Sequence, residues 1–240
     1  MRLDKFLSHT GFGSRKEVKE LLKKKRVTVN GDVIKEAKYS VDELSDCICV
    51  DGDNIMYEQF VYYMLNKPKG VISATEDPSA RTVVDLIKKE DYKKGLFPVG
   101  RLDKDTTGLL LLTNDGALAH ELLSPKKKVP KVYQALVQGK MTDEDIDIFS
   151  KGEIRLDGED CLPAKLTIVS FDEEKKQSVI QLAIMEGKYH QVKRMVSAVG
   201  KKVIELERLE MANLKLDKQL PRGKYRVLTE QEKEMLKNNE

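Results

Sequence analysis

Residues 100–116 constrain the fold more than any other part of this sequence. They read GRLDKDTTGLLLLTNDG, so a polar loop leads into an apolar run at 109–112 and then into a second turn. Four consecutive leucines between turn-forming residues are typical of a buried strand. We therefore expect Arg101 and Asp103 to lie at the mouth of an apolar strand, where Gly108 permits a close approach of the backbone.

Several other runs have the composition of strands, with helical patterns between them. The strand-like runs cover residues 61–65, 109–113, 131–137, 164–169 and 178–184, and helices are expected at about 81–89, 115–123, 142–150, 190–199 and 230–240. The elements do not follow a regular strand–helix–strand rhythm. The pattern therefore predicts an α+β fold with a mixed, mainly antiparallel sheet flanked by helices.

The first 40 residues are basic, whereas the rest of the chain is nearly neutral. They hold eleven Lys/Arg against five Asp/Glu, a formal charge of +6, and the remaining 200 residues sum to −3. A basic end is typical of a module that binds a polyanion, although a solvated helix face rich in lysine has the same composition.

Local patterns in this basic region predict two short helices and a hairpin. Both helices fall within residues 2–26, and Ser14 with Glu17 predicts a capping box at the start of the second. Asn30-Gly31 predicts a hairpin over residues 27–34, and residues 47–50 read as a third strand. We therefore expect a small module at 1–52, a linker at 53–60 and a larger domain at 61–240.

The cysteines and histidines form no metal-binding or disulfide pattern. The three cysteines lack a C-x-x-C spacing, and the three histidines are scattered. Charge begins at residue 2, so there is no signal-peptide core, and the run at 109–112 is too short to cross a bilayer. These observations predict a cytoplasmic protein of a reducing compartment, with no metal and no membrane contact.

Asp103 has two interpretations. An aspartate at the mouth of an apolar strand can be partly desolvated and still ionised if a cation lies close, which suits a carboxylate nucleophile. The alternative is that Asp103 or Asp105 caps a turn.

Two further segments bear on this choice. Residues 66–71 (NKPKGV) form a rigid, basic turn in which Lys67 is a candidate phosphate contact. Residues 186–195 (EGKYHQVKRM) open a helix whose Val192 and Met195 can pack inward while Lys193 or Arg194 faces a cleft.

Residues 2–50 resemble the S4 RNA-binding domain. The resemblance rests on the runs RLDKFL, SR and RVTVNG, which occur in the expected order. It implies that the basic second helix and the hairpin lie against structured RNA. The candidate contacts in this module are Arg2, Arg15, Lys24, Lys25 and Arg26.

The Lys-Pro-x-Gly turn, GRLDxxTxGL and EGKYHQVKR together resemble the motifs of pseudouridine synthases. With an S4 domain in front, residues 2 to about 229 are similar to the family of the ribosomal small-subunit pseudouridine synthase A. Relatives that act on the large subunit tend to carry an Asn-Arg-x-Val-Arg-Arg version of the third motif. The Tyr-His-Gln-Val-Lys-Arg version therefore favours 16S rRNA.

The resemblance implies a role for each matching residue. Asp103 would be the nucleophile, Tyr133 would stack on the base and Lys193 would pair with the aspartate. Because many relatives have Arg at that point, Lys193 and Arg194 both remain candidates for the pairing. Arg101 would displace the flipped uridine, and Lys67, His190 and Arg194 are further candidate RNA contacts.

The expected function is isomerisation of one uridine in small-subunit rRNA, without metal or cofactor. The expected partner is 16S rRNA or a small-subunit assembly intermediate, and the expected state is a monomer. Two alternatives are kept: a synthase for 23S rRNA, and a non-catalytic rRNA-binding assembly factor.

Overall fold

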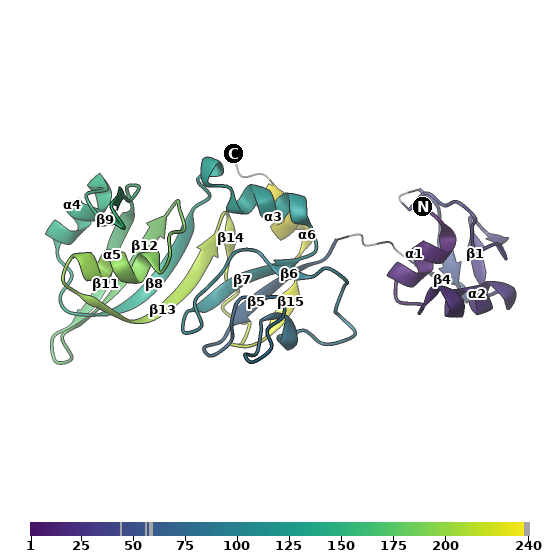
Figure 1. The fold of residues 1–240 in the computed structure, drawn as a ribbon, viewed down its shortest axis with the longest axis horizontal. Helices are drawn as coiled ribbons and strands as arrows, with labels where there is room; N and C mark the ends of the chain where they lie inside the picture. Colours follow the sequence, from purple (N-terminus) through teal and green to yellow (C-terminus); the bar gives the residue numbers. More distant parts are fainter. Residues whose placement is uncertain (44, 56, 58–59, 238–240) are drawn as a thin grey trace. The chain divides into compact units, whose positions relative to one another are not determined.

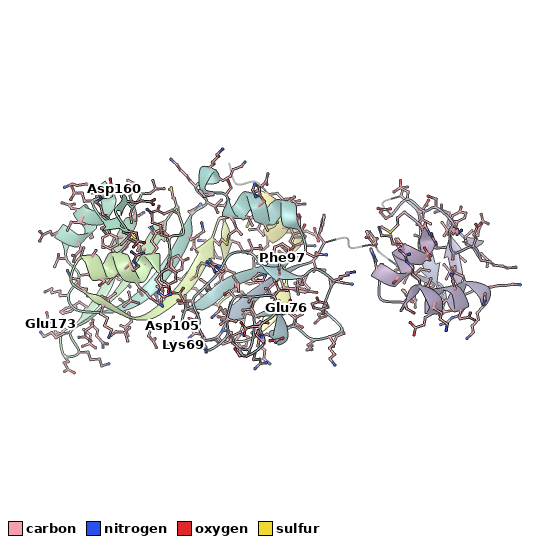
Figure 2. All side chains as sticks on the ribbon, in the orientation of Figure 1. Lys69, Glu76, Phe97, Asp105, Asp160 and Glu173 are labelled. Atoms are coloured by element: carbon pink, nitrogen blue, oxygen red, sulfur yellow. The ribbon has the colours of Figure 1, made fainter. Side chains whose placement is uncertain are left out.

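The computed structural model describes residues 1–43, 45–55, 57 and 60–237. The chain divides into two units, Met1–Gln59 and Phe60–Glu240 (Figure 1). Figure 2 shows polar side-chain ends around the outside of each unit, as expected for a chain with 35% charged residues.

The N-terminal unit consists of two helices and a small antiparallel sheet. The elements are α1 (Leu3–His9), α2 (Arg15–Lys23), β1 (Val27–Val29), β2 (Asp32–Val33), β3 (Ile48–Val50) and β4 (Asp53–Asn54), with strand order β2-β1-β3-β4. The Ser14 side chain accepts from the Glu17 backbone N–H, and Glu17 accepts from that of Ser14, which confirms the capping box. Asn30 and Gly31, both at positive φ, connect paired strands β1 and β2, which confirms the hairpin.

The boundary of the expected linker needs a correction. Asp53 and Asn54 form β4 and pair with β3, because the turn at Asp51-Gly52 folds the chain back. Residues 56, 58 and 59 of the expected linker lie outside the described residues. The apolar side chains of the N-terminal unit, among them Phe6, Leu22 and Ile48, form a core of their own.

Within the described residues, the C-terminal unit is built on a nine-stranded mixed sheet with the order β11-β12-β8-β13-β7-β5-β15; β14 pairs with β13 and β6 with β7. The strands are β5 (Tyr62–Lys67), β6 (Phe97–Pro98), β7 (Thr107–Thr113), β8 (Lys131–Gln138), β11 (Lys165–Asp172), β12 (Gln177–Ile184), β13 (Lys202–Met211), β14 (Leu214–Lys215) and β15 (Tyr225–Val227), with β9 (Arg155–Leu156) and β10 (Glu159–Asp160) as a separate pair. The helices are α3 (Gly116–Leu123), α4 (Asp143–Lys151), α5 (Gln191–Ala198), α6 (Glu230–Lys237) and the 3-10 turns η1 (Val84–Leu86) and η2 (Pro125–Lys127).

Strands β5 and β7 are buried on both faces. Tyr63 and Leu110 belong to a core that includes α4 and α5, whereas Met64 and Leu109 belong to a second core that includes α3 and α6. The two cores on opposite faces explain why the leucine run does not alternate with polar residues.

The pairing of β7 with β13 is parallel and short. It joins Glu207 to Thr107 and Arg208 to Gly108, whereas β8 pairs with β13 antiparallel along most of its length. This short pairing connects the antiparallel group β11-β12-β8-β13 to the group β7-β5-β15.

Two expectations about this unit were wrong or incomplete. The helix expected at 81–89 is only the turn η1. After this turn the chain is held by Tyr225 instead of by helical hydrogen bonds, because the Tyr225 hydroxyl accepts from the Lys88 N–H and donates to the Asp91 carboxylate. Strands β13 and β15 were not predicted at all. Helix α6 begins at Glu230 as expected, while residues 238–240 lie outside the described part of the chain.

Candidate active site

The loop between β6 and β7 carries Asp103 and is tied to its surroundings by backbone hydrogen bonds. The Ser73 hydroxyl accepts from the Leu102 N–H at 3.0 Å and donates to the Leu102 carbonyl at 2.9 Å. The Thr106 N–H donates to the Asp103 carbonyl at 3.1 Å, which closes a turn. The loop therefore presents the Asp103 side chain from a fixed backbone.

Lys67 lies beneath this loop and is fully buried. Its ammonium donates to the carbonyl oxygens of Thr106 at 2.9 Å, Asp103 at 3.0 Å and Pro68 at 3.1 Å. Burial lowers the pKa of Lys67 to about 8. The expected RNA contact by Lys67 is therefore wrong, because the ammonium is used to hold the loop from below.

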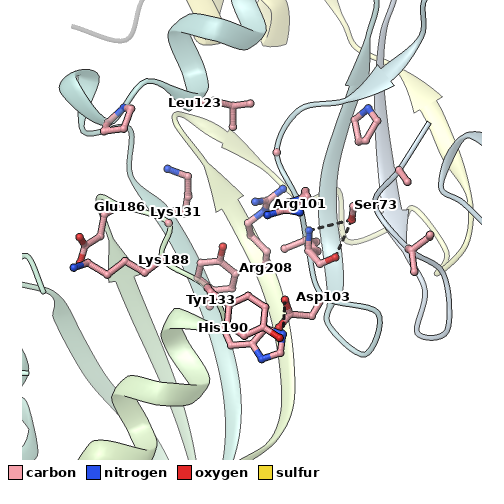
Figure 3. A pocket seen from close by; sticks show the side chains of 18 of the residues that line it. Ser73, Arg101, Asp103, Leu123, Lys131, Tyr133, Glu186, Lys188, His190 and Arg208 are labelled. Carbon is pink, nitrogen blue, oxygen red and sulfur yellow. Dashed lines mark hydrogen bonds and ion pairs between the residues drawn. The ribbon is translucent and has the colours of Figure 1, made fainter. Parts of the chain in front are cut away.

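The Asp103 carboxylate faces two nitrogen-bearing side chains. Lys193 Nζ lies 2.9 Å from Oδ2. His190 Nε2 lies 3.5 Å from Oδ1 (Figure 3). Lys193 also contacts Asp105 at 2.6 Å. Burial acts to lower the pKa of Lys193, but hydrogen bonds to Asp105 and Asp103 outweigh it and raise this pKa overall. The hydrogen bond from Lys193 in turn lowers the pKa of Asp105. Lys193 is therefore held as a cation beside Asp103.

Helix α5 directs Lys193 to this position. Val192 and Met195 on its inner side are buried in the main core, so Lys193 projects toward the loop. Arg194 instead pairs with Asp157 through both of its terminal nitrogens, at 2.6 and 2.9 Å. Of the two candidates for the aspartate partner, Lys193 is the one in contact.

The opposite wall of the cavity is formed by β8 and β13. Tyr133 on β8 is paired in register with Arg208 on β13, so both side chains emerge on one face of the sheet. Together with Asp103, Arg101 and Lys131 they line a cavity of about 1170 Å³ (Figure 3). Arg101 is exposed at this site, as a residue that replaces a flipped base would need to be.

Arg208 and Tyr189 are among the cavity residues that the sequence analysis missed. Arg208 is only 2% exposed, although Arg in a charged strand reads as a surface residue. Tyr189 is 72% exposed and stacks on His190 with ring centroids 3.9 Å apart. Its place within the third motif was the available indication, because aromatic side chains in basic grooves often stack on bases.

Gly108 explains how Arg208 reaches the cavity. Its φ is +99°, and a Cβ there would lie 2.3 Å from the Arg208 carbonyl oxygen. Only glycine therefore allows β7 and β13 to approach so closely. Arg208 Nε then donates to the Leu109 carbonyl at 2.8 Å.

The candidate RNA contacts of the N-terminal unit differ in how they are held. Arg26 pairs with Asp51, and Arg2 pairs with the buried Asp4 at 2.6 Å. The exposed cations that follow or begin α2 are Arg15, Lys24 and Lys25. Arg2 and Arg26 would have to be shared between these carboxylates and RNA.

Among the described residues, no cluster of three or more His, Cys, Asp or Glu side chains is arranged to hold a metal ion. Nor does that part of the chain contain a helix with the length and apolar character needed to cross a membrane.

A basic module followed by a domain with an ion-paired aspartate in a cation-lined cavity defines a class of RNA-acting enzymes. The sequence model of the RNA pseudouridylate synthase family matches residues 61–198, and that of the S4 domain matches residues 1–46. The chain belongs to the RNA pseudouridylate synthase family, and it is a pseudouridine synthase that acts on RNA.

Several relatives match this chain along nearly its whole length. An uncharacterised RNA pseudouridine synthase of Bacillus subtilis is 49% identical and covers 98% of both chains. The ribosomal large subunit pseudouridine synthase B of Bacillus subtilis is 44% identical over 98% of this chain and 95% of its own. The ribosomal small subunit pseudouridine synthase A of Vibrio cholerae is 41% identical over 97% of each. A solved pseudouridylate synthase superposes with a TM-score of 0.67 at 33% identity, covering 98% of this chain and 99% of its own.

Proposed function

We propose that this enzyme isomerises one uridine in small-subunit rRNA, with Asp103 as the nucleophile. The observation that carries the catalytic assignment is the 2.9 Å contact between the Asp103 carboxylate and Lys193, across the cavity from Tyr133. The contact with the Lys193 ammonium fixes the orientation of the carboxylate, as a nucleophile requires.

The reaction exchanges one glycosidic bond for another. The N1–C1′ bond of uridine breaks, the uracil rotates and a C5–C1′ bond forms. The proton on C5 leaves to a base and N1 takes up a proton, so that the product is an isomer of the substrate. Since these atoms are inaccessible in a stacked helix, the nucleotide must first be flipped out, which costs a few kcal/mol. Arg101 at the mouth of the cavity takes the place of the uridine in the stack, and Tyr133 holds the flipped base.

The Tyr-His-Gln-Val-Lys-Arg version of the third motif, residues 189–194, supports a small-subunit target, because it resembles the version of the small-subunit family. A large-subunit target is the second candidate, because identity to the large subunit synthase B is slightly higher, 44% against 41%. The basic N-terminal unit would supply RNA affinity for either target.

Tritium release tests both parts of the proposal. Separate 16S and 23S transcripts carrying tritium at C5 of uridine are incubated with the enzyme, and the released label is counted. We expect release from the 16S transcript, and carbodiimide-stop primer extension then locates the modified position. Release from the 23S transcript alone would overturn the small-subunit target.

The role of Asp103 is tested with a matched pair of variants. Asp103→Asn should abolish release, whereas Asp105→Asn, which removes the other carboxylate bound to Lys193, should lose far less. Equal release by wild type and Asp103→Asn would eliminate Asp103 as the nucleophile.

A further inference from the structure

Arg208 is a buried cation with unused hydrogen-bonding capacity. It is 2% exposed, and its Nε donates to the Leu109 carbonyl. Its Nη2 atom is also buried and has no hydrogen-bond partner among the described residues. Buried polar nitrogens are nearly always paired, so Arg208, which lines the cavity, carries an unsatisfied donor beside it.

Lys131 adds a second cation to the same wall. It lies two residues before Tyr133 on β8, so all three side chains of Lys131, Tyr133 and Arg208 emerge on one face. Burial, followed by repulsion from Arg208, lowers the pKa of Lys131. Its ammonium donates to the Val129 carbonyl at 2.9 Å. Among the described residues neither Lys131 nor Arg208 forms an ion pair with a carboxylate.

The ligand that fits two neighbouring cations is an anion. Uracil is neutral and would leave their repulsion unchanged, whereas a phosphodiester would compensate both charges and accept from the Arg208 guanidinium. The Asp103 carboxylate on the facing wall would repel a phosphate. This repulsion would keep the phosphate against Arg208 and Lys131 and away from Asp103. A phosphate held on this wall would turn the ribose and base toward Asp103.

We propose that Arg208 and Lys131 together bind a single backbone phosphate of the substrate RNA, next to the nucleotide held against Tyr133. This subsite rests on the proposed placement of the uridine between Asp103 and Tyr133. It fixes the direction in which the strand enters the cavity, in addition to the affinity supplied by the N-terminal unit.

The salt dependence of RNA binding tests the subsite. A fluorescent oligouridylate is titrated with the full chain between about 50 and 200 mM salt, and the slope of log K against log salt is measured. The double variant Arg208→Gln/Lys131→Gln should reduce the slope by about 0.7, the value for one phosphate of a single strand. Each single variant should reduce it by less, because the remaining cation still neutralises the same phosphate. Lys175→Gln, in the exposed turn between β11 and β12, is the matched control and should keep the wild-type slope.

Arg208→Lys separates binding from folding. It retains the charge but alters the packing, so its slope should stay near that of wild type, and thermal unfolding identifies any variant that fails to fold. If Arg208→Gln is unfolded, the slope of Lys131→Gln decides alone, and an unchanged slope there would overturn the proposal. A folded double variant with the wild-type slope would also overturn it, as would a reduction of about 1.4, the value for two separate phosphates. Because binding of oligouridylate involves neither chemistry nor a particular uridine, this result is independent of tritium release from 16S rRNA.

Discussion

Replacing Lys67 with methionine tests whether a buried ammonium holds the Asp103 loop. Methionine keeps an apolar stem of similar length and removes the donor to the carbonyls of Asp103 and Thr106. Because the Lys67 pKa of about 8 lies below the ordinary value of 10.5, ionisation in the folded state is opposed by about 3 kcal/mol at neutral pH. Each carbonyl left without a donor costs about 1–3 kcal/mol. These terms are of similar size and opposite sign, so the free energy of unfolding at pH 7 should change little.

The pH dependence of stability should change much more. Between pH 8 and 10.5 the folded wild type holds fewer protons on Lys67 than the unfolded chain does, so Lys67 makes the free energy of unfolding rise with pH. From about pH 7 to 10 this contribution amounts to about 2.5 kcal/mol, and Lys67→Met should lose it. Urea unfolding of both proteins at the two pH values measures the difference, in which all other titrating groups cancel.

Activity gives the second readout. Without its anchor the Asp103 loop should shift, and a displacement of about 1 Å at a reacting group can lower kcat by about 10²-fold. We expect kcat for tritium release to fall while KM changes little. A variant with the wild-type kcat and the wild-type pH dependence of stability would refute this account of Lys67.

Three other substitutions probe the cavity. Gly108→Ala places a Cβ against the Arg208 carbonyl at a φ of +99°. The free energy of unfolding, measured by urea titration, should therefore fall by about 2 kcal/mol or more, and undiminished stability would contradict the close approach of the two strands. Lys193→Gln should lower kcat at least about 10²-fold, whereas Lys193→Arg should retain part of the wild-type kcat because it keeps a donor cation beside Asp103. A fully active glutamine variant would exclude a role for Lys193 as the partner of Asp103. Tyr189→Ala should weaken oligouridylate binding about tenfold in fluorescence titrations and Tyr189→Phe should not, and equal affinity of both would show that no base stacks there.

Features that depend on neighbouring residues were predictable from the sequence. The capping box of Ser14 and Glu17, the Asn30-Gly31 hairpin and the leucine run of β7 each require only a short segment. The catalytic motifs were recognised because their order in the chain resembles a family, and the structure brings Asp103 and Lys193, 90 residues apart, into contact.

Features set by distant contacts were not predictable. Strand β13 reads KVIELERLEM and has two register shifts, so its buried positions do not alternate and it resembles a charged surface segment. The backbone of Arg208 lies directly against Gly108 of another strand, a contact that no local pattern indicates. Lys67 appeared available to RNA because its carbonyl acceptors at Asp103 and Thr106 lie more than 35 residues further along the chain.

The short parallel pairing of β7 with β13 has a mechanical consequence. Asp103 is carried by the β7 side of the sheet, whereas Tyr133 and Lys193 belong to the β8–β13 side. A sheet joined over two residue pairs bends there more easily than along the long antiparallel pairings on either side. RNA that contacts both sides of the cavity would bend the sheet at this junction when the uridine binds. Part of the binding free energy would then be used to align Asp103 with Tyr133 and Lys193.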